Sequence, residues 1–136
     1  ILNRFSRIVS ASSESAQFNT ENVHLIIDDF SREAMGQAAE QFLRNDGQAV
    51  LAKFPGAHLW DISGHSTLIV VFYLKEDDIA RGQKDGTSDA IRQECFDGVK
   101  PYDEFDYFTP DNFSIKFDSK QNVDENYEGS MFYYWR

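Results

Sequence analysis

The stretch that decides the fold is His58-Leu59-Trp60-Asp61-Ile62-Ser63-Gly64-His65-Ser66-Thr67-Leu68-Ile69-Val70-Val71-Phe72-Tyr73-Leu74. Residues 66–74 are rich in β-branched and aromatic side chains, the types that favour strands. Residues 58–62 alternate in character, and Ser63-Gly64-His65 is typical of a tight connection between strands. We therefore expect a hairpin of two strands, with the second strand central because both of its faces are mostly apolar.

Helical patterns precede this hairpin. Residues 2–18 carry a weak one, which predicts only a short helix. Residues 20–45 allow either one long helix, which we favour, or a strand at 24–27 followed by a helix. Both alternatives place a helix over 32–44, because this segment is rich in Ala, Glu, Gln and Leu and is followed by Asn45-Asp46-Gly47.

The remaining elements are short. Pro55-Gly56 ends one helix, and the clean alternation of residues 113–117 indicates a half-buried strand. We expect Phe113, Ile115, Phe117 and Phe132 in the core. The expected elements are a helix at 48–54, a loop at 75–87, a helix at 89–97, an irregular segment at 101–110, a strand at 113–117, a polar loop at 121–129 and a closing strand at 130–136.

This order of helices and strands indicates an α+β fold. We expect an antiparallel sheet of about four strands with the N-terminal helices packed on one face. The 136 residues are the length of a single domain, 1–136, and can form a core without disulfides. The lone Cys95 favours a reducing compartment, and no apolar run approaches the roughly 20 residues that span a bilayer. We therefore expect a cytoplasmic protein.

The net charge of −10 is unevenly distributed. Residues 1–75 hold six basic and eight acidic groups, whereas residues 76–136 hold seven basic and fifteen acidic groups, a net charge of −8. Such a surface repels nucleic-acid phosphates and anionic lipids and attracts basic proteins. We therefore expect a basic protein as partner, and neither nucleic acid nor membrane. Acidity that serves only solubility is the alternative.

No motif in the sequence assigns a catalytic residue, a metal site or a cofactor. His58 and His65 lack the spacing of a metal-binding pair, and Cys95 is expected in the core beside Ile91. Carboxylates are plentiful, but a hydrolase needs two of them at a fixed separation, one with a raised pKa. We expect a protein without enzymatic activity whose carboxylates form a solvated face.

Acidic and aromatic residues are mixed in two segments, 102–111 and 121–128, and beside them. Aromatic rings recur as interface hot spots, and carboxylates around them steer a basic partner. The alternative is that the rings pack beneath the sheet and only the acids face water. The candidate partner-binding residues are Tyr102, Asp103, Glu104, Asp106, Tyr107, Asp111, Asp124, Glu125, Tyr127 and Glu128.

The C-terminal block begins with Tyr107-Phe108-Thr109-Pro110-Asp111-Asn112-Phe113-Ser114-Ile115-Lys116-Phe117-Asp118 and closes with an aromatic segment from Tyr127 to Trp135. This block, about a fifth of the chain, resembles the ending of small acidic immunity proteins from bacterial polymorphic-toxin and contact-dependent growth-inhibition systems. The resemblance implies a non-enzymatic inhibitor that binds its cognate toxin and blocks the active site or substrate groove. Many such toxins are basic nucleases, which an acidic inhibitor would complement.

Three hypotheses about function follow. The first is an immunity protein that neutralises a basic bacterial toxin, a nuclease, through its acidic, aromatic surface. The second is a small hydrolase with clustered carboxylates in a cleft, which predicts a deep pocket lined by a buried carboxyl group of raised pKa. The third is an acidic adaptor or nucleic-acid mimic with a different basic partner.

Overall fold

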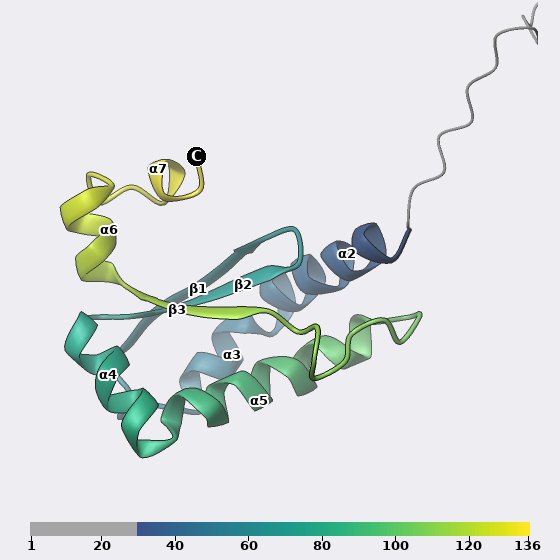
Figure 1. The fold of residues 1–136 in the computed structure, drawn as a ribbon, viewed down its shortest axis with the longest axis horizontal. Coiled ribbons are helices and arrows are strands. Elements are labelled where there is room, and N and C mark those ends of the chain that lie inside the picture. Colours follow the sequence, from purple (N-terminus) through teal and green to yellow (C-terminus); the bar gives the residue numbers. More distant parts are fainter. Residues whose placement is uncertain (1–29) are drawn as a thin grey trace, which may run out of the picture.

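A three-stranded sheet lies at the centre of residues 30–136, the part of the chain that the computed structural model describes (Figure 1). Strand β1 (Leu59–His65) pairs antiparallel with β2 (Leu68–Tyr73), and β2 lies between β1 and β3. The hairpin and the central place of its second strand are thus confirmed. The tight turn was misplaced, however, because Ser63-Gly64-His65 belongs to β1 and the turn is at Ser66-Thr67.

The third strand runs in the direction opposite to expectation. Strand β3 (Ile115–Ser119) pairs parallel with β2, so within residues 30–136 the sheet is mixed and has three strands rather than four antiparallel ones. A parallel connection needs a crossover of a dozen or more residues. Helices α4 (Glu76–Asp85) and α5 (Thr87–Val99) supply it, although residues 75–87 were expected to be a loop.

The C-terminal segment is also helical where other structure was expected. Helix α6 (Lys120–Asn126) replaces the polar loop, and its first turn is capped by the Ser119 hydroxyl, which accepts a hydrogen bond from the Asn122 amide at 2.9 Å. A short helix, α7 (Met131–Tyr134), replaces the closing strand. Phe132 on α7 is 71% exposed, so its assignment to the core was wrong.

The helices before the sheet agree with the sequence patterns. Helix α2 (Phe30–Asn45) and helix α3 (Gly47–Ala52) are where the composition and Pro55-Gly56 predicted them. The interpretations of residues 2–18 and 20–29 lie outside the described residues. Within residues 30–136, none of the helices is both long enough and apolar enough to cross a membrane.

Strand β2 divides the apolar interior into two cores. Ile69, Val71 and Tyr73 pack with α2, α3 and α5 on one face of the sheet, whereas Val70 and Phe72 pack on the other face with α6 and α7. The N-terminal helix therefore contacts the sheet on one face, and the C-terminal helices cover the opposite one (Figure 1). This arrangement separates the two acidic, aromatic segments that the sequence suggested as one surface.

Candidate functional site

The ten predicted partner-binding residues fall into two groups that lie far apart. Those at 102–111 follow α5 and the short helix η2 (Lys100–Tyr102), close to the beginning of α2, whereas those at 124–128 belong to α6 and the turn after it (Figure 1). Each group has its own polar network and its own exposed carboxylates. In the 102–111 group, Glu104, Asp106 and Asp111 are exposed, and the exposed Phe105 lies among them in sequence.

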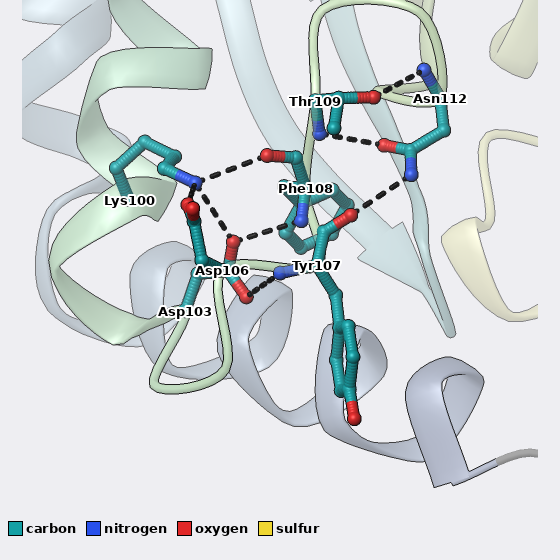
Figure 2. A network of polar contacts seen from close by, with 7 residues as sticks. All are labelled: Lys100, Asp103, Asp106, Tyr107, Phe108, Thr109 and Asn112. Atoms are coloured by element: carbon teal, nitrogen blue, oxygen red, sulfur yellow. Dashed lines mark hydrogen bonds and ion pairs between the residues drawn. The ribbon is translucent and has the colours of Figure 1, made fainter.

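The buried carboxylate of Asp103 organises this segment (Figure 2). Its Oδ1 accepts a hydrogen bond from the Tyr107 amide at 3.0 Å, and its Oδ2 accepts one from the Phe108 amide at 2.8 Å. The Lys100 ammonium donates a further bond to Oδ2 at 3.0 Å. Burial alone would raise the pKa of the Asp103 carboxyl, but these three donors outweigh it and lower the pKa. Asp103 therefore shapes the segment from inside and is not part of its outer surface.

Lys100 completes the network. Its ammonium also donates to the Phe108 carbonyl at 3.0 Å and forms an ion pair with Asp106. Hydrogen bonds to Asp106 and Asp103 raise the pKa of Lys100, which keeps it charged. The single positive charge in residues 100–111 is thus used internally, so the other charged groups of this segment are all acidic.

A second set of hydrogen bonds fixes the end of the segment. The Asn112 carbonyl oxygen Oδ1 accepts from the Thr109 amide at 2.8 Å, and its Nδ2 donates to the Tyr107 carbonyl at 2.9 Å. Figure 2 shows the Tyr107 ring pointing away from both sets of hydrogen bonds while its backbone takes part in them. The backbone is therefore held in place, and the side chains that point outward are displayed in a defined geometry.

Phe105 and Tyr107 lie beside Phe30, the first residue of α2, and we call these three rings the aromatic patch. Phe105 is 49% exposed and Phe30 is 54% exposed, both large apolar areas for a folded domain. The Phe105 ring stacks on Tyr107 with centroids 5.6 Å apart and meets Phe30 edge to face, also at 5.6 Å. The contact joins the start of α2 to the 102–111 segment.

Acidic residues flank Phe105 and Tyr107 in the sequence. Glu104, Asp106 and Asp111 are exposed, and Glu104 makes no side-chain hydrogen bond or ion pair within residues 30–136. Tyr102 has a different role, because its hydroxyl donates a 2.6 Å hydrogen bond to Asp46 and so ties the segment to the end of α2. That hydrogen bond raises the pKa of Tyr102.

The second group surrounds another buried carboxylate, that of Asp118. Burial alone would raise the pKa of this carboxyl, but the hydrogen bonds that it accepts outweigh burial and lower the pKa. Its donors are the Tyr134 hydroxyl at 2.7 Å, the Lys116 ammonium at 2.9 Å, the Ser119 amide at 2.8 Å and Asn122 Nδ2 at 2.9 Å. This network attaches α7 to the sheet.

The predicted residues of α6 lie on the solvent side of this network. Asp124 and Glu125 are exposed and pair along the helix with Lys120 and Gln121. Glu128 is exposed after the helix, whereas Tyr127 is half-buried against Tyr134, with ring centroids 5.1 Å apart. The Asp124 and Glu125 carboxylates thus already have partners on α6, unlike the Glu104 carboxylate.

Two members of the aromatic patch were not among the predicted residues. Phe105 lies between Glu104 and Asp106, and an apolar ring flanked by acids in an irregular segment is a signal for an exposed hydrophobe. Phe30 gave no such signal, because it fits the apolar spacing of the helix that follows it.

The buried carboxyls of Asp103 and Asp118 differ from the general acid that a hydrolase needs. The carboxyls of Asp103 and Asp118 have lowered pKa values, opposite to the raised pKa of a general acid. Cys95 is fully buried, and desolvation raises the pKa of its thiol to about 12, so it is a core residue as expected. Within residues 30–136, no three His, Cys, Asp or Glu side chains lie close enough together to hold a metal ion.

A groove of about 510 Å³ lies between α2 and the β1–β2 turn. Its carboxylates, Glu33 and Glu40, are exposed and pair with Gln37 and Arg44. His58 lies elsewhere, beside Asp78, with Nδ1 3.2 Å from the Asp78 Oδ1 atom. Asp78 is buried, and the cavity that it lines has a volume of about 50 Å³, far below that of a deep pocket.

Comparison with known proteins adds no relative to this picture. No protein-family model, no curated protein sequence and no solved structure matches the chain. Within residues 30–136, the aromatic patch combines exposed rings with exposed carboxylates.

Proposed function

We propose that this chain is a non-enzymatic protein-binding domain that docks a basic partner on the aromatic patch and the neighbouring carboxylates Glu104, Asp106 and Asp111. The observation that carries the proposal is the exposure of Phe105, held between two other rings and flanked by acids. A half-exposed ring loses further apolar area to a partner, at about 25 cal/mol per Å².

The patch is prepared for binding before a partner arrives. The Asp103 and Asn112 hydrogen bonds fix the backbone at Tyr107, and the Tyr107 ring in turn supports Phe105. Preorganisation of this kind lowers the entropy lost on association, which is about 0.5–1.5 kcal/mol for each side chain immobilised. Aromatic anchors with few rotatable bonds are typical interface hot spots for the same reason.

The negative charge of the chain favours a partner of positive charge. The net charge of −8 in residues 76–136 attracts a basic protein over long range and raises the rate of association. At the patch itself, Glu104 is available for a new ion pair because no described side chain pairs with it. This combination favours specific docking over acidity that serves only solubility.

The partner that we propose is a basic bacterial toxin domain, a nuclease, which the chain neutralises as an immunity protein does. The resemblance of the C-terminal block to immunity proteins supports this choice, and the acidic patch would compete with a nucleic-acid phosphate for the basic groove of such an enzyme. In this proposal the inhibitor acts by covering the substrate groove.

The test is protection against the toxin domain encoded beside the gene for this chain. We expect cells that produce both proteins to grow, and the purified chain to inhibit the toxin at a one-to-one ratio. Growth arrest despite abundant folded chain, or a neighbouring gene that encodes no toxin, would contradict the immunity role. Binding should weaken steeply as salt is raised, because surface charge is screened.

A further inference from the structure

We infer that the cavity between α2 and the 102–105 segment is a socket for one arginine side chain of the partner. This inference rests on the proposed docking function and specifies the chemistry of its central contact. The cavity has a volume of about 170 Å³, below the roughly 300–1,000 Å³ of typical small-molecule sites. Its size suits a single long side chain.

The walls of the socket divide into an apolar and a polar part. Phe30, Phe105, Ala34 and the buried Ala38 line the apolar part. Glu104, Gln37, Gln41 and Tyr102 line the polar part. Within residues 30–136, neither the Glu104 carboxylate nor the Gln41 amide hydrogen-bonds another side chain, so no described residue occupies their acceptor oxygens. An occupant must therefore carry an apolar stem and a cationic head rich in donors.

Arginine meets these requirements better than lysine. Its methylene stem can lie along Ala34 and Ala38, as long basic side chains often lie on apolar surface. Its planar guanidinium can stack on the Phe105 ring, which an ammonium does less well, and its several donors can serve both Glu104 and Gln41. The patch also offers ring faces, which favour cations within about 6 Å of the centroid.

Within the proposed socket, the Glu104 carboxylate contributes more to arginine binding than the overall charge of the chain does. A charge-assisted hydrogen bond between a guanidinium and a carboxylate is about twice as strong as a neutral one, and the surrounding rings limit its competition with water. The exposed acids Glu33 and Glu40 also line a groove, but they pair with Gln37 and Arg44, whereas Glu104 pairs with no described side chain. Glu104 is thus the residue that distinguishes this surface from a general acidic face.

The experiment is a titration of the ¹⁵N-labelled full chain with the peptide acetyl-Gly-Arg-Gly-amide, followed by heteronuclear NMR. We expect saturable shifts in the amides of residues 30–41 and 102–105, and smaller ones with the corresponding lysine peptide. The citrulline peptide, which is neutral and nearly the same shape, should give no saturable shift. Glu104→Gln should weaken binding of the arginine peptide about tenfold, whereas the control Glu128→Gln should leave it unchanged.

Equal shifts with citrulline, or arginine shifts that persist in Glu104→Gln, would overturn the inference. So would shifts that centre on α6 instead of α2. This failure is distinguishable from a failure of the proposed function. If the toxin still binds and depends on Phe105, only the arginine socket is wrong; if Phe105 is irrelevant to the toxin as well, both are wrong.

Discussion

Lys100 and Asp103 form an ion pair, with Nζ 3.0 Å from Oδ2, at the base of the segment that presents the aromatic patch. The Asp103 side chain is 2% exposed and that of Lys100 is 31% exposed, so the pair is shielded on the carboxylate side. The same carboxylate binds two backbone amides, which makes it the fixed point from which Phe105 and Tyr107 are displayed. The sequence predicted that Asp103 would contact a partner. In the structure it instead positions Phe105 and Tyr107, the residues that we propose make that contact.

Asp103→Asn should destabilise the protein by about 1–3 kcal/mol. An amide has one acceptor oxygen, and in either orientation its NH₂ group would face the Tyr107 or the Phe108 amide, which are themselves donors. The measurement is urea denaturation. Asp106→Asn is the matched control, because its side chain is 86% exposed, and its effect should stay within about 0.5 kcal/mol.

Stability should fall on the acid side because of Asp103 and Asp118. The folded-state pKa of each carboxyl lies below the ordinary value of 3.8, so each contributes stability that is complete above that value and is lost as the pH falls through the folded pKa. The urea midpoint should decrease below about pH 4. The decrease should be shallower in Asp118→Asn; an identical pH profile would show that this carboxyl contributes nothing.

Tyr134→Phe should loosen the C-terminal helices. The Tyr134 hydroxyl donates to Asp118 at 2.7 Å and accepts from Lys116 at 3.1 Å, so its loss leaves a buried carboxylate with one donor fewer. We expect a loss of about 1–2 kcal/mol and faster hydrogen exchange in α6 and α7. Tyr133→Phe is the control, since Tyr133 is 44% exposed and its hydroxyl makes no hydrogen bond within residues 30–136.

Gly98→Ala should destabilise the core by about 1–3 kcal/mol, even though alanine favours a helix. A Cβ at position 98 would lie 2.5 Å from the Phe42 ring, which is itself fully buried and has no space to move. Gly56→Ala is the control, because a Cβ at position 56 would meet nothing within 4 Å. Thermal or urea unfolding of both variants checks the close packing of α2 against α5.

The sequence predicted the parts of the fold that local chemistry determines. The apolar run of β2 identified the central strand because it is buried on both faces, and the composition of α2 identified a helix without reference to its neighbours. Helix α4 escaped prediction because only Ile79 anchors it to the main core and three acids fill its first turn. Acidic residues in the first turn stabilise a helix, but a polar run of this kind is also typical of a loop.

The C-terminal segment shows a different limit. Residues 130–136 have the aromatic content of a strand, yet Tyr134 and Trp135 lie on one side and pack against β2 and β1 through Phe72 and Ser63. Tyr134 is held by Asp118, sixteen residues before it, and no local pattern reveals such a contact. The candidate site was likewise predicted by composition, whereas the division into inner Asp103 and outer Glu104 follows only from the fold.

The most direct test of the central claim compares two exposed phenylalanines on opposite sides of the sheet. The affinity of the neighbouring toxin domain would be measured by calorimetry for the unmodified chain, for Phe105→Ala and for Phe132→Ala. Phe105 is 49% exposed and belongs to the aromatic patch, whereas Phe132 is 71% exposed and belongs to α7. Phe105→Ala should weaken binding about tenfold or more, and Phe132→Ala should leave it unchanged. Equal affinities for all three proteins, or a loss only in Phe132→Ala, would contradict docking on the aromatic patch.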